Sequence, residues 1–263
     1  MTRFRAALGV RDFFLFTLDA LRYDVAMEAL ESGRAPHLQA LVGSFERRDS
    51  PATFTFPAHQ AFFAGFLPTP SEAPDATRTL ALRFHGARSV DEHTLVLDAP
   101  SIVEGLRRAG YRTLCVGGTG FFDPGQPLGS VLPSMFDEAH WSRELGVASP
   151  HASRRQVDLA VELLDRLPSA QRCFLFINFS ATHPPTRIFV PGAREESKET
   201  QAAALVELDR HLPRLVEGLR RRGGAVGIVC SDHGTCFGEG GHVGHRVAHP
   251  CVWTVPYAEV EVA

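Results

Sequence analysis

An acid and an imidazole follow directly after an apolar run near the carboxyl end of the sequence. Residues 226–230 lead through Ser231 into Asp232 and His233. A carboxylate oxygen and an imidazole nitrogen are both good ligands for zinc, and the carboxylate also suits manganese or magnesium. For an isolated Asp-His pair, a turn in which His233 is only a cap would be the simpler interpretation. Other residues of the chain favour a metal site instead.

A second acid stands in the same position relative to an apolar run. Residues 13–18 are largely apolar and end at Asp19, which is typical of a strand buried on both faces of a parallel sheet. The carboxyl ends of such strands border the crevice in which open α/β sheets bind ligands. We therefore expect Asp19 to meet Asp232 and His233 there. Asp24 lies near the start of the next helix, where an acid more often complements the helix dipole.

Two threonines precede a predicted helix. Pro57 forces Phe56 out of the helical region and suits a first helical position, so a helix is expected from there to about Ala64. Free N–H groups and the positive dipole end at such a terminus favour a phosphate or sulfate. Coordination to a metal would make the hydroxyl of Thr55 or Thr53 an accessible nucleophile. The alternative for both is an ordinary capping residue.

Histidines occur after one apolar run and in one glycine-rich stretch. His183 follows the run 173–179, and His242, His245 and His249 are interspersed with glycines. Four glycines forbid a helix, which excludes the zinc-protease motif because its two histidines must share a helical face. A flexible loop with three histidines close to an Asp-His pair is hard to explain by packing. We expect at least one of them to be functional.

Composition excludes several classes of protein. The chain has 263 residues, is 44% hydrophobic and carries a net charge of -3, so it can build a sizeable core and lacks the basic footprint of a nucleic-acid binder. The apolar run 13–16 is too short for a signal peptide or a spanning helix. We expect a cytoplasmic protein that binds neither nucleic acid nor membrane. Five cysteines without Cys-x-x-Cys spacing argue against a disulfide framework or a structural zinc site.

The order of apolar runs and helical patterns predicts an α/β fold, with a mostly parallel central sheet flanked by helices on both faces. Residues 1–263 are expected to form a single catalytic domain, in which residues 68–98 make a loop or small excursion beside the site. The expected strands are 13–18, 111–117, 173–179, 226–230, 252–255 and 259–262, and the expected helices are 21–30, 35–41, 101–109, 153–167 and a long helix, 205–219, that Pro213 should kink.

Missing motifs exclude two further classes of enzyme. Asp123 stands where a dinucleotide-binding fingerprint beginning at Gly118 would need its third glycine, so a Rossmann cofactor site is not expected. The sequence also lacks the Gly-x-Ser-x-Gly nucleophile elbow of a serine esterase.

Taken together, the sequence resembles the alkaline phosphatase and sulfatase superfamily. The similarity extends over almost the whole chain. Its pieces, in family order, are Asp19-Ala20-Leu21-Arg22-Tyr23-Asp24, Pro36-His37-Leu38, Thr55-Phe56-Pro57-Ala58-His59 with Gly65, Ala109-Gly110-Tyr111-Arg112-Thr113, His183-Pro184, and Ser231-Asp232-His233-Gly234 with the loop that begins at Gly238.

This resemblance implies a divalent metal held by Asp19, Asp232, His233 and the hydroxyl of Thr55. Zn²⁺ is the favoured ion, with Mn²⁺ or Mg²⁺ as alternatives. It also implies that Thr55 is the nucleophile, because Thr-Phe-Pro-x-His resembles the nucleophile motif of nucleotide pyrophosphatase-like phosphodiesterases. Sulfatases of the superfamily use Cys/Ser-x-Pro-x-Arg, and here the arginine position is occupied by His59, which disfavours sulfatase activity.

The roles expected of the remaining histidines depend on how many metal ions the family resemblance implies. A two-zinc member would have an Asp-x-x-x-His pair, but Phe179 stands four residues before His183, so one ion is favoured. His183 and His245 are then expected to be catalytic, as donors of hydrogen bonds or of a proton. Contacts to the substrate are assigned to His59, His242 and His249.

The expected activity is hydrolysis of a small-molecule phosphate ester, a phosphodiester or a phosphomonoester, through a phosphothreonine intermediate. Transfer to an acceptor shares the same first half-reaction and stays open as a second activity. Sulfatase-like hydrolysis and a non-catalytic, metal-binding role within the same superfamily also stay open. The sequence gives no prediction of oligomeric state.

Overall fold

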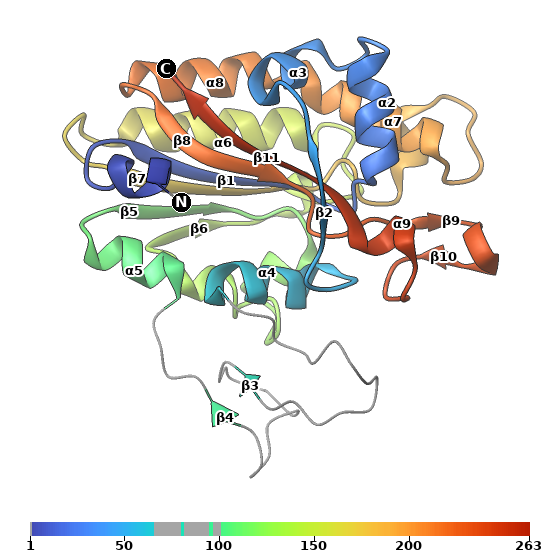
Figure 1. Cartoon of the computed structure of the whole chain (residues 1–263), viewed down its shortest axis with the longest axis horizontal. Helices are drawn as coiled ribbons and strands as arrows, with labels where there is room; N and C mark the ends of the chain where they lie inside the picture. The colour runs from blue at the N-terminus through green and yellow to red at the C-terminus, as the bar shows by residue number, and fades with distance from the viewer. Residues whose placement is uncertain (1, 66–79, 82–94, 97–100) are drawn as a thin grey trace.

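A seven-stranded sheet lies at the centre of the molecule (Figure 1). The structure is a computed structural model that describes residues 2–65, 80–81, 95–96 and 101–263. The strands of this sheet are β1 (Asp12–Leu18), β2 (Glu46–Asp49), β5 (Arg112–Val116), β6 (Glu138–His140), β7 (Cys173–Phe179), β8 (Ala225–Cys230) and β11 (Thr254–Val262).

The strand order is β2-β11-β8-β1-β7-β5-β6. The five strands from β8 to β6 run parallel, whereas β11 is antiparallel to both β8 and β2. This arrangement confirms the predicted α/β fold with a mostly parallel sheet. It also brings the carboxyl ends of β1, β7 and β8 next to one another, where polar side chains follow each strand.

Helices cover both faces of the sheet (Figure 1). One face carries α2 (Tyr23–Glu31), α3 (Pro36–Val42), α6 (Ala152–Arg166), α7 (Lys198–Asp209) and α8 (Leu212–Arg221), and the other carries α4 (Thr55–Ala64) and α5 (Ile102–Arg108). The smaller elements are α1 (Thr2–Ala7), β3 (Leu80–Ala81), β4 (Leu95–Val96), β9 (Cys236–Phe237), β10 (Val243–Gly244), α9 (Pro250–Trp253) and 3-10 turns at Gly120–Phe122, Pro133–Met135, Arg143–Leu145, Thr186–Phe189 and Glu239–Gly241.

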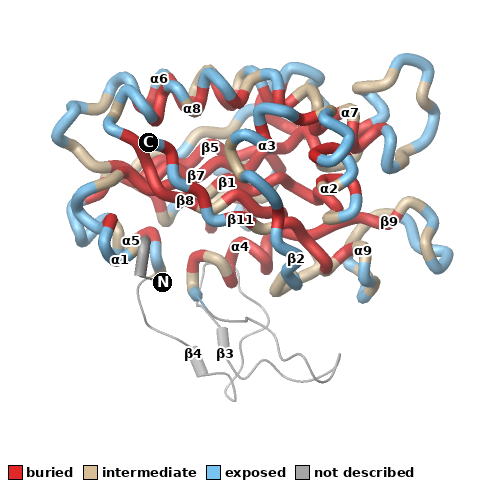
Figure 2. The backbone as a smooth tube through the Cα atoms, turned by 45° about the horizontal axis from the view of Figure 1, so that its top comes forward, coloured by how far each residue is buried: buried red, intermediate tan, exposed pale blue. Residues whose placement is uncertain are grey.

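The apolar strands supply a core to each face. Successive side chains of a strand point to opposite faces, so Phe14 and Phe16 pack with the helices of the larger layer. Phe13, Phe174 and Phe176 pack on the other side with side chains of α4 and α5. Figure 2 shows the resulting buried sheet between helices whose outer surfaces are exposed. Burial on both faces explains why these strands read as continuous apolar runs.

The carboxyl-terminal third differs from the prediction in two places. The expected single helix 205–219 is two helices, α7 and α8, because Pro213 lies in the first turn of α8, where its missing N–H leaves no helical bond unmade. The structure has a single closing strand, β11, where two strands were expected. Residues 250–253, which include the start of the first expected strand, form the short helix α9. The predicted excursion at 68–98 lies almost entirely outside the described residues.

Candidate metal centre and nucleophile

Three ligand-type side chains meet at the carboxyl ends of two neighbouring strands. Asp19 follows β1, and Asp232 and His233 follow β8, which pairs with β1 in parallel register. All three side chains are completely buried. Their potential ligand atoms lie within 4.8 Å of one another. The structure therefore brings together the three residues that the sequence assigned to a metal.

The atoms that face the centre of this cluster lack partners. Among the described residues, Asp19 Oδ1 and Asp232 Oδ2 are buried without a hydrogen bond. His233 Nδ1 donates to the carbonyl oxygen of Gly234 at 2.8 Å, which leaves the Nε2 lone pair for the cluster. His233 Nε2 lies 3.7 Å from Asp19 Oδ1 and 3.6 Å from Asp232 Oδ2. Because unpaired buried oxygens are costly, this donor set fits a divalent cation.

Electrostatics at the centre agree with that interpretation. Burial, together with the charge of nearby Asp232, raises the pKa of Asp19 to about 6. Burial likewise raises the pKa of Asp232 to about 7. Burial lowers the pKa of His233 to about 4, so the ring is neutral at pH 7, as a metal ligand must be. A cation between the carboxylates would remove both their repulsion and their desolvation penalty.

The other carboxylate oxygens are fixed by the protein. Asp232 Oδ1 accepts hydrogen bonds from the backbone N–H groups of Ala20 at 3.1 Å and His233 at 3.0 Å. Asp19 Oδ2 accepts one from Asn178 Nδ2 at 2.8 Å. Ala20 has φ 58°, a left-handed conformation that costs a non-glycine residue energy and here aims its N–H at Asp232. Each acid thus has one oxygen held and one presented, which orients it as a ligand.

Thr55 stands at the edge of the metal cluster. It is the first residue of α4, after the extended Phe54, rather than a residue just ahead of a helix that begins at Pro57. Its Oγ1 lies 3.4 Å from His233 Nε2 and 3.5 Å from Asp19 Oδ2. The hydroxyl is therefore close to the cluster and lies at the positive end of the α4 dipole, which favours an anion.

The position of Thr53, the second candidate nucleophile, is fixed by a hydrogen bond of its backbone. Its carbonyl oxygen accepts a hydrogen bond from the N–H of Arg246 at 2.9 Å. The guanidinium of Arg246 lies 5.0 Å from the ring centroid of Phe54. This segment thus joins the start of α4 to the histidine-bearing loop, and the distances favour Thr55 as the hydroxyl at the metal centre.

The two predicted catalytic histidines border the centre. The ring centroid of His245 is 4.6 Å from that of His233 and 5.2 Å from that of His183. Both rings are half-buried. His183 Nδ1 donates to the carbonyl oxygen of Pro184 at 2.6 Å, so its Nε2 is the nitrogen available to a ligand. The structure therefore brings His183 and His245 to the site from two separate segments.

His59 is a correction to the sequence prediction. A substrate contact was expected, but its side chain is completely buried and is surrounded by Phe62, Phe63 and other rings. Its Nδ1 donates to the carbonyl oxygen of Thr55 at 2.7 Å, and its Nε2 lies 3.0 Å from Thr17 Oγ1. Burial lowers its pKa to about 3, so it is neutral. The geometry gives His59 a role in positioning Thr55.

His242 and His249 lie together on the loop. Their ring centroids are 6.2 Å apart, and His249 Nδ1 lies 2.9 Å from the sulfur of Cys251. Half-buried His249 is the residue before α9, and His242 is exposed. The predicted substrate contacts of these two side chains are therefore not supported by their neighbours.

A buried arginine that sequence reasoning did not assign holds the loop to the core. Arg22 is 4% exposed and forms hydrogen bonds with both carboxylate oxygens of Asp24, at 2.8 and 2.7 Å. It also pairs with Glu239 on the loop and donates to the carbonyl oxygen of Thr235 at 3.4 Å. Asp24 therefore serves as an ion-pair partner as well as an acid in the first turn of α2. The Arg-x-Asp spacing was the available signal, but its partner Glu239 is distant in sequence.

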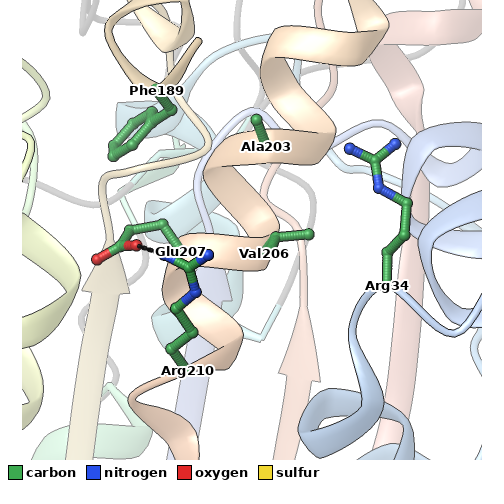
Figure 3. Close-up of a pocket in the computed structure, with 6 residues that line it drawn as sticks. All are labelled: Arg34, Phe189, Ala203, Val206, Glu207 and Arg210. Carbon is green, nitrogen blue, oxygen red and sulfur yellow. Dashed lines mark hydrogen bonds and ion pairs between the residues drawn. The ribbon is translucent and has the colours of Figure 1, made fainter. Parts of the chain in front are cut away.

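A pocket of about 250 Å³ lies away from this centre, along α7 (Figure 3). It offers two arginines, but Arg34 is paired with Glu199 at 2.9 and 3.0 Å, and Arg210 with Glu207 at 2.8 Å. Cations that are already neutralised give no strong anion site. The buried acids at the strand ends are the better candidate.

Comparisons with known proteins identify the fold. No family model matches the sequence, and no curated protein matches it. The structure is similar to the C-terminal periplasmic domain of the phosphoethanolamine transferase EptC from Campylobacter jejuni, with 13% identity and a TM-score of 0.64, over 95% of this chain and 79% of that one.

Two further structures give the same result. The periplasmic domain of EcEptC from Escherichia coli in complex with Zn has 13% identity and a TM-score of 0.63, over 96% of this chain and 73% of that one. A protein in the alkaline phosphatase superfamily from Vibrio parahaemolyticus has 16% identity and a TM-score of 0.59, over 95% and 60%. The chain thus spans between about three fifths and four fifths of the length of these structures.

The similar structures correct one prediction. The expectation of a cytoplasmic protein is contradicted, because both EptC structures are described as periplasmic domains and point to a location outside the cytoplasm. The expectation rested on a short apolar run at residues 13–16, which is part of the buried strand β1. Within the described ranges, no helix is long and apolar enough to cross a membrane.

The resemblance found in the sequence is confirmed at the level of structure. These structures align with this chain over at least 95% of its length, with TM-scores of 0.59 to 0.64. The chain has the fold of the alkaline phosphatase and sulfatase superfamily.

Proposed function

We propose that this chain is a metal-dependent enzyme that cleaves a small phosphate ester, with Thr55 as the nucleophile. The observation that carries the proposal is the pair of unpaired buried oxygens, Asp19 Oδ1 and Asp232 Oδ2, that face His233 Nε2 beside the Thr55 hydroxyl. We further propose that residues 1–263 act as one catalytic domain.

Asp19, Asp232 and His233 would hold the ion, with the Thr55 hydroxyl beside it. A bound Zn²⁺, or Mn²⁺ or Mg²⁺, would lower the pKa of that hydroxyl and offset negative charge on a phosphoryl oxygen. One ion is the proposed number. Phe179, where a second site would need a carboxylate, is completely buried in the apolar core.

The first half-reaction would form a phosphothreonine. Thr55 Oγ1 makes the new bond to phosphorus, the ester P–O bond breaks, and the hydroxyl proton is lost while the leaving oxygen gains one. The positive dipole end at the start of α4 would favour the negatively charged phosphoryl group. His183 and His245, which border the cluster, would give hydrogen bonds or a proton to the oxygens that the ion does not neutralise.

The second half-reaction defines the enzyme class. Attack of water on phosphothreonine would make the chain a phosphodiesterase or phosphatase, which is the proposal that follows from the Thr-Phe-Pro-Ala-His motif. Attack of another hydroxyl would make it a transferase. The similarity to a phosphoethanolamine transferase favours this second candidate. Both share the metal, Thr55 and the covalent intermediate.

Trapping the intermediate tests the proposal. Purified protein loaded with Zn²⁺ would be incubated with phosphodiesters, phosphomonoesters and sulfate esters, quenched in acid and analysed by peptide mass spectrometry. We expect one phosphoryl group on Thr55, and turnover of at least one phosphate ester. Free alcohol without added acceptor indicates hydrolysis, whereas turnover that needs an added alcohol indicates transfer.

Thr55→Ala and Thr53→Ala form a matched pair for this experiment. Removing a covalent nucleophile should lower turnover on the order of 10³-fold or more, while metal content stays the same. Thr53→Ala should have a much smaller effect, because the contact that places Thr53 uses its backbone carbonyl. A phosphoryl group on Thr53, or turnover only of sulfate esters, would contradict the proposal. Absence of any turnover would favour a non-catalytic relative.

A further inference from the structure

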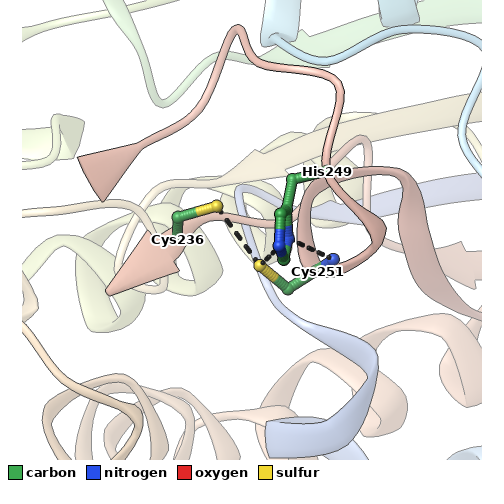
Figure 4. Close-up of side chains that lie close together, drawn as sticks. All are labelled: Cys236, His249 and Cys251. Carbon is green, nitrogen blue, oxygen red and sulfur yellow. Dashed lines mark hydrogen bonds between the residues drawn. The ribbon is translucent and has the colours of Figure 1, made fainter. Parts of the chain in front are cut away.

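A second group of metal-binding side chains lies on the loop, apart from the acidic centre (Figure 4). The sulfur atoms of Cys236 and Cys251 are 3.3 Å apart, and His249 Nδ1 is 2.9 Å from the sulfur of Cys251. The ligand atoms of all three side chains lie within 4.8 Å of one another. We propose that these residues bind a structural Zn²⁺ that is separate from the catalytic ion.

The donor atoms and distances suit zinc. Thiolate sulfur and imidazole nitrogen are its usual ligands in structural sites, at about 2.3 Å and 2.0–2.1 Å from the ion. Tetrahedral angles at those bond lengths separate neighbouring ligand atoms by roughly 3.5–3.8 Å. The two sulfurs, which are 3.3 Å apart, and the pair of His249 Nδ1 and the sulfur of Cys251, which is 2.9 Å apart, would each need to separate by roughly half an ångström.

The imidazole presents the correct nitrogen. His249 Nδ1 accepts a long hydrogen bond of 3.3 Å from the N–H of Cys251, so this nitrogen carries the lone pair. The same nitrogen faces the sulfur of Cys251. The exposed imidazole of His242, whose ring centroid is 6.2 Å from that of His249, is the adjacent side chain for a fourth position.

The segment between the cysteines is rich in glycine and is held to the rest of the chain mainly by Glu239, which pairs with Arg22, and by Arg246, which bonds to Thr53. It contains Gly238, Gly240, Gly241 and Gly244, each with a positive φ that glycine adopts freely. The side chain of Val243, the hydrophobic residue of β10, is 78% exposed. A cross-link between positions 236 and 251 would close this loop and reduce the entropy lost on ordering it. His245, which borders the catalytic centre, lies inside the closed segment.

Close packing connects the proposed zinc site to the catalytic centre. The N–H of Gly234, the residue after His233, donates to the carbonyl oxygen of Val252 at 2.6 Å. A side-chain carbon at Gly234 would be 2.0 Å from the carbonyl oxygen of Cys251, so α9 lies directly against the strand end. A fixed Cys251 would therefore also fix the backbone at Gly234, directly after His233. Sequence spacing gave no sign of this site, because the cysteines are 15 positions apart and lack a Cys-x-x-Cys pair.

Cobalt substitution tests the proposal. Thiolate ligands give Co²⁺ a charge-transfer absorption in the near ultraviolet, which oxygen and nitrogen ligands alone do not give. We expect two metal equivalents per chain in the wild type, and a thiolate band on loading with Co²⁺. Cys236→Ser should remove one equivalent and abolish the band. Cys115→Ser, at a buried free thiol in strand β5, is the matched control and should retain both.

Asp232→Asn separates this proposal from the proposed function. That variant should lose the catalytic ion and retain the thiolate band, so an inactive chain would still report on the second site. If Cys236→Ser does not fold, His249→Ala removes the half-buried ligand and should shift or abolish the band. Retention of the unchanged band in both variants would overturn the proposal. So would a Cys236–Cys251 disulfide in wild-type protein mapped without reductant, since oxidised sulfurs cannot act as thiolate ligands.

Discussion

Two buried polar clusters lie next to each other at the end of the sheet, and they differ in how their atoms are paired. One joins Thr17 of β1, Asn178 of β7 and His59 of α4. Thr17 and Asn178 are register partners in neighbouring strands. Asn178 Nδ2 donates to Thr17 Oγ1 at 3.2 Å, and Thr17 Oγ1 donates to His59 Nε2 at 3.0 Å. The ring then donates to the carbonyl oxygen of Thr55 at 2.7 Å, so both of its nitrogens are engaged.

The metal cluster is equally buried but leaves its central atoms open. Asp19 Oδ1 and Asp232 Oδ2 have no hydrogen-bond partner in the described ranges, and the Nε2 of neutral His233 faces both. The Nδ1 of His59 also lies 3.7 Å from Asp232 Oδ2. Asn178 connects the two clusters through its second bond, to Asp19 Oδ2 at 2.8 Å. Equal burial therefore does not indicate equal function. A paired cluster fixes the scaffold, whereas a cluster with convergent open donors is suited to hold a ligand.

Asp232→Asn should have the largest effect, because it removes a charged ligand from the open metal cluster. An amide offers a weaker ligand and no charge, so we expect loss of the catalytic ion and a fall in turnover on the order of 10³-fold or more. Elemental analysis and steady-state rates measure this. Asp209→Asn is the matched control, because Asp209 is a buried acid whose Oδ1 already accepts a hydrogen bond from the N–H of Leu38 at 2.6 Å. Equal metal loss in both variants would contradict the assignment.

Without metal, the two acids should make stability depend on pH. Burial raises the pKa of Asp19 to about 6 and of Asp232 to about 7, from 3.8. The unfolded chain then releases these protons at lower pH than the folded chain, so the stability that the two acids contribute is present below about pH 4 and falls as pH rises to about 7. The loss should be a few kcal/mol, since one pKa unit corresponds to about 1.4 kcal/mol. Buried His59 and His233, whose pKa values burial lowers from 6.5 to about 3 and about 4, contribute with the opposite sign below pH 6.5.

Urea unfolding in chelator at several pH values measures this dependence. The double variant Asp19→Asn, Asp232→Asn is the control, because it lacks both acids and retains the buried histidines. The stability of metal-free wild type relative to this variant should fall as pH rises from 4 to 7. Saturating Zn²⁺ should reverse the trend in the wild type, because the ion binds the deprotonated carboxylates. A metal-free wild type with the same profile as the double variant over this range would argue against the raised pKa values.

His59→Ala tests the paired cluster by stability rather than by metal. The variant loses a completely buried ring and leaves the Thr55 carbonyl and Thr17 hydroxyl without their partner. We expect a decrease in unfolding free energy of about 3 kcal/mol, with unchanged metal content in the folded protein. His140→Ala, at a partly exposed ring near the sheet edge, should cost less than about 1 kcal/mol. Metal loss in folded His59→Ala would show that His59 acts as more than a support.

The sequence predicted those parts of the molecule whose structure follows from residues that are adjacent along the chain. Apolar runs buried on both faces gave the parallel strands, and Asp19, Asp232 and His233 were found because each directly follows such a run. The exposed edge strand β2 was missed, because its residues Glu46–Asp49 are charged and carry no strand pattern. Charged side chains on an edge strand discourage pairing with other chains. The same side chains are uncommon in strands, so the sequence pattern of β2 does not predict one.

The less successful predictions all concerned contacts between distant segments. His59 was expected to contact the substrate, but its ring bonds to Thr17 of β1 and to the carbonyl oxygen of Thr55 and packs against phenylalanine rings. Cys236 and Cys251 had no sequence signal, since a loop brings them together. The composition of the histidine loop predicted a functional role. It could not show that His245 lies beside His183, whereas His249 lies beside Cys251.

The histidines beside the open cluster give the smallest expected effect and address the number of ions. If two ions were present, His183 and His245 would be ligands, and removing either would remove one metal equivalent from the catalytic site. With one ion, they give hydrogen bonds or a proton to the phosphoryl and leaving oxygens, and His183→Ala or His245→Ala should lower turnover on the order of 10²-fold at unchanged metal content. The proximity of the rings, 5.2 Å between centroids, predicts that the double variant is less than additively impaired. His151→Ala, at an exposed residue before α6, is the control for surface loss of an imidazole. Loss of one equivalent from the catalytic site in either single variant would instead establish ligands for a second ion and overturn the one-ion arrangement.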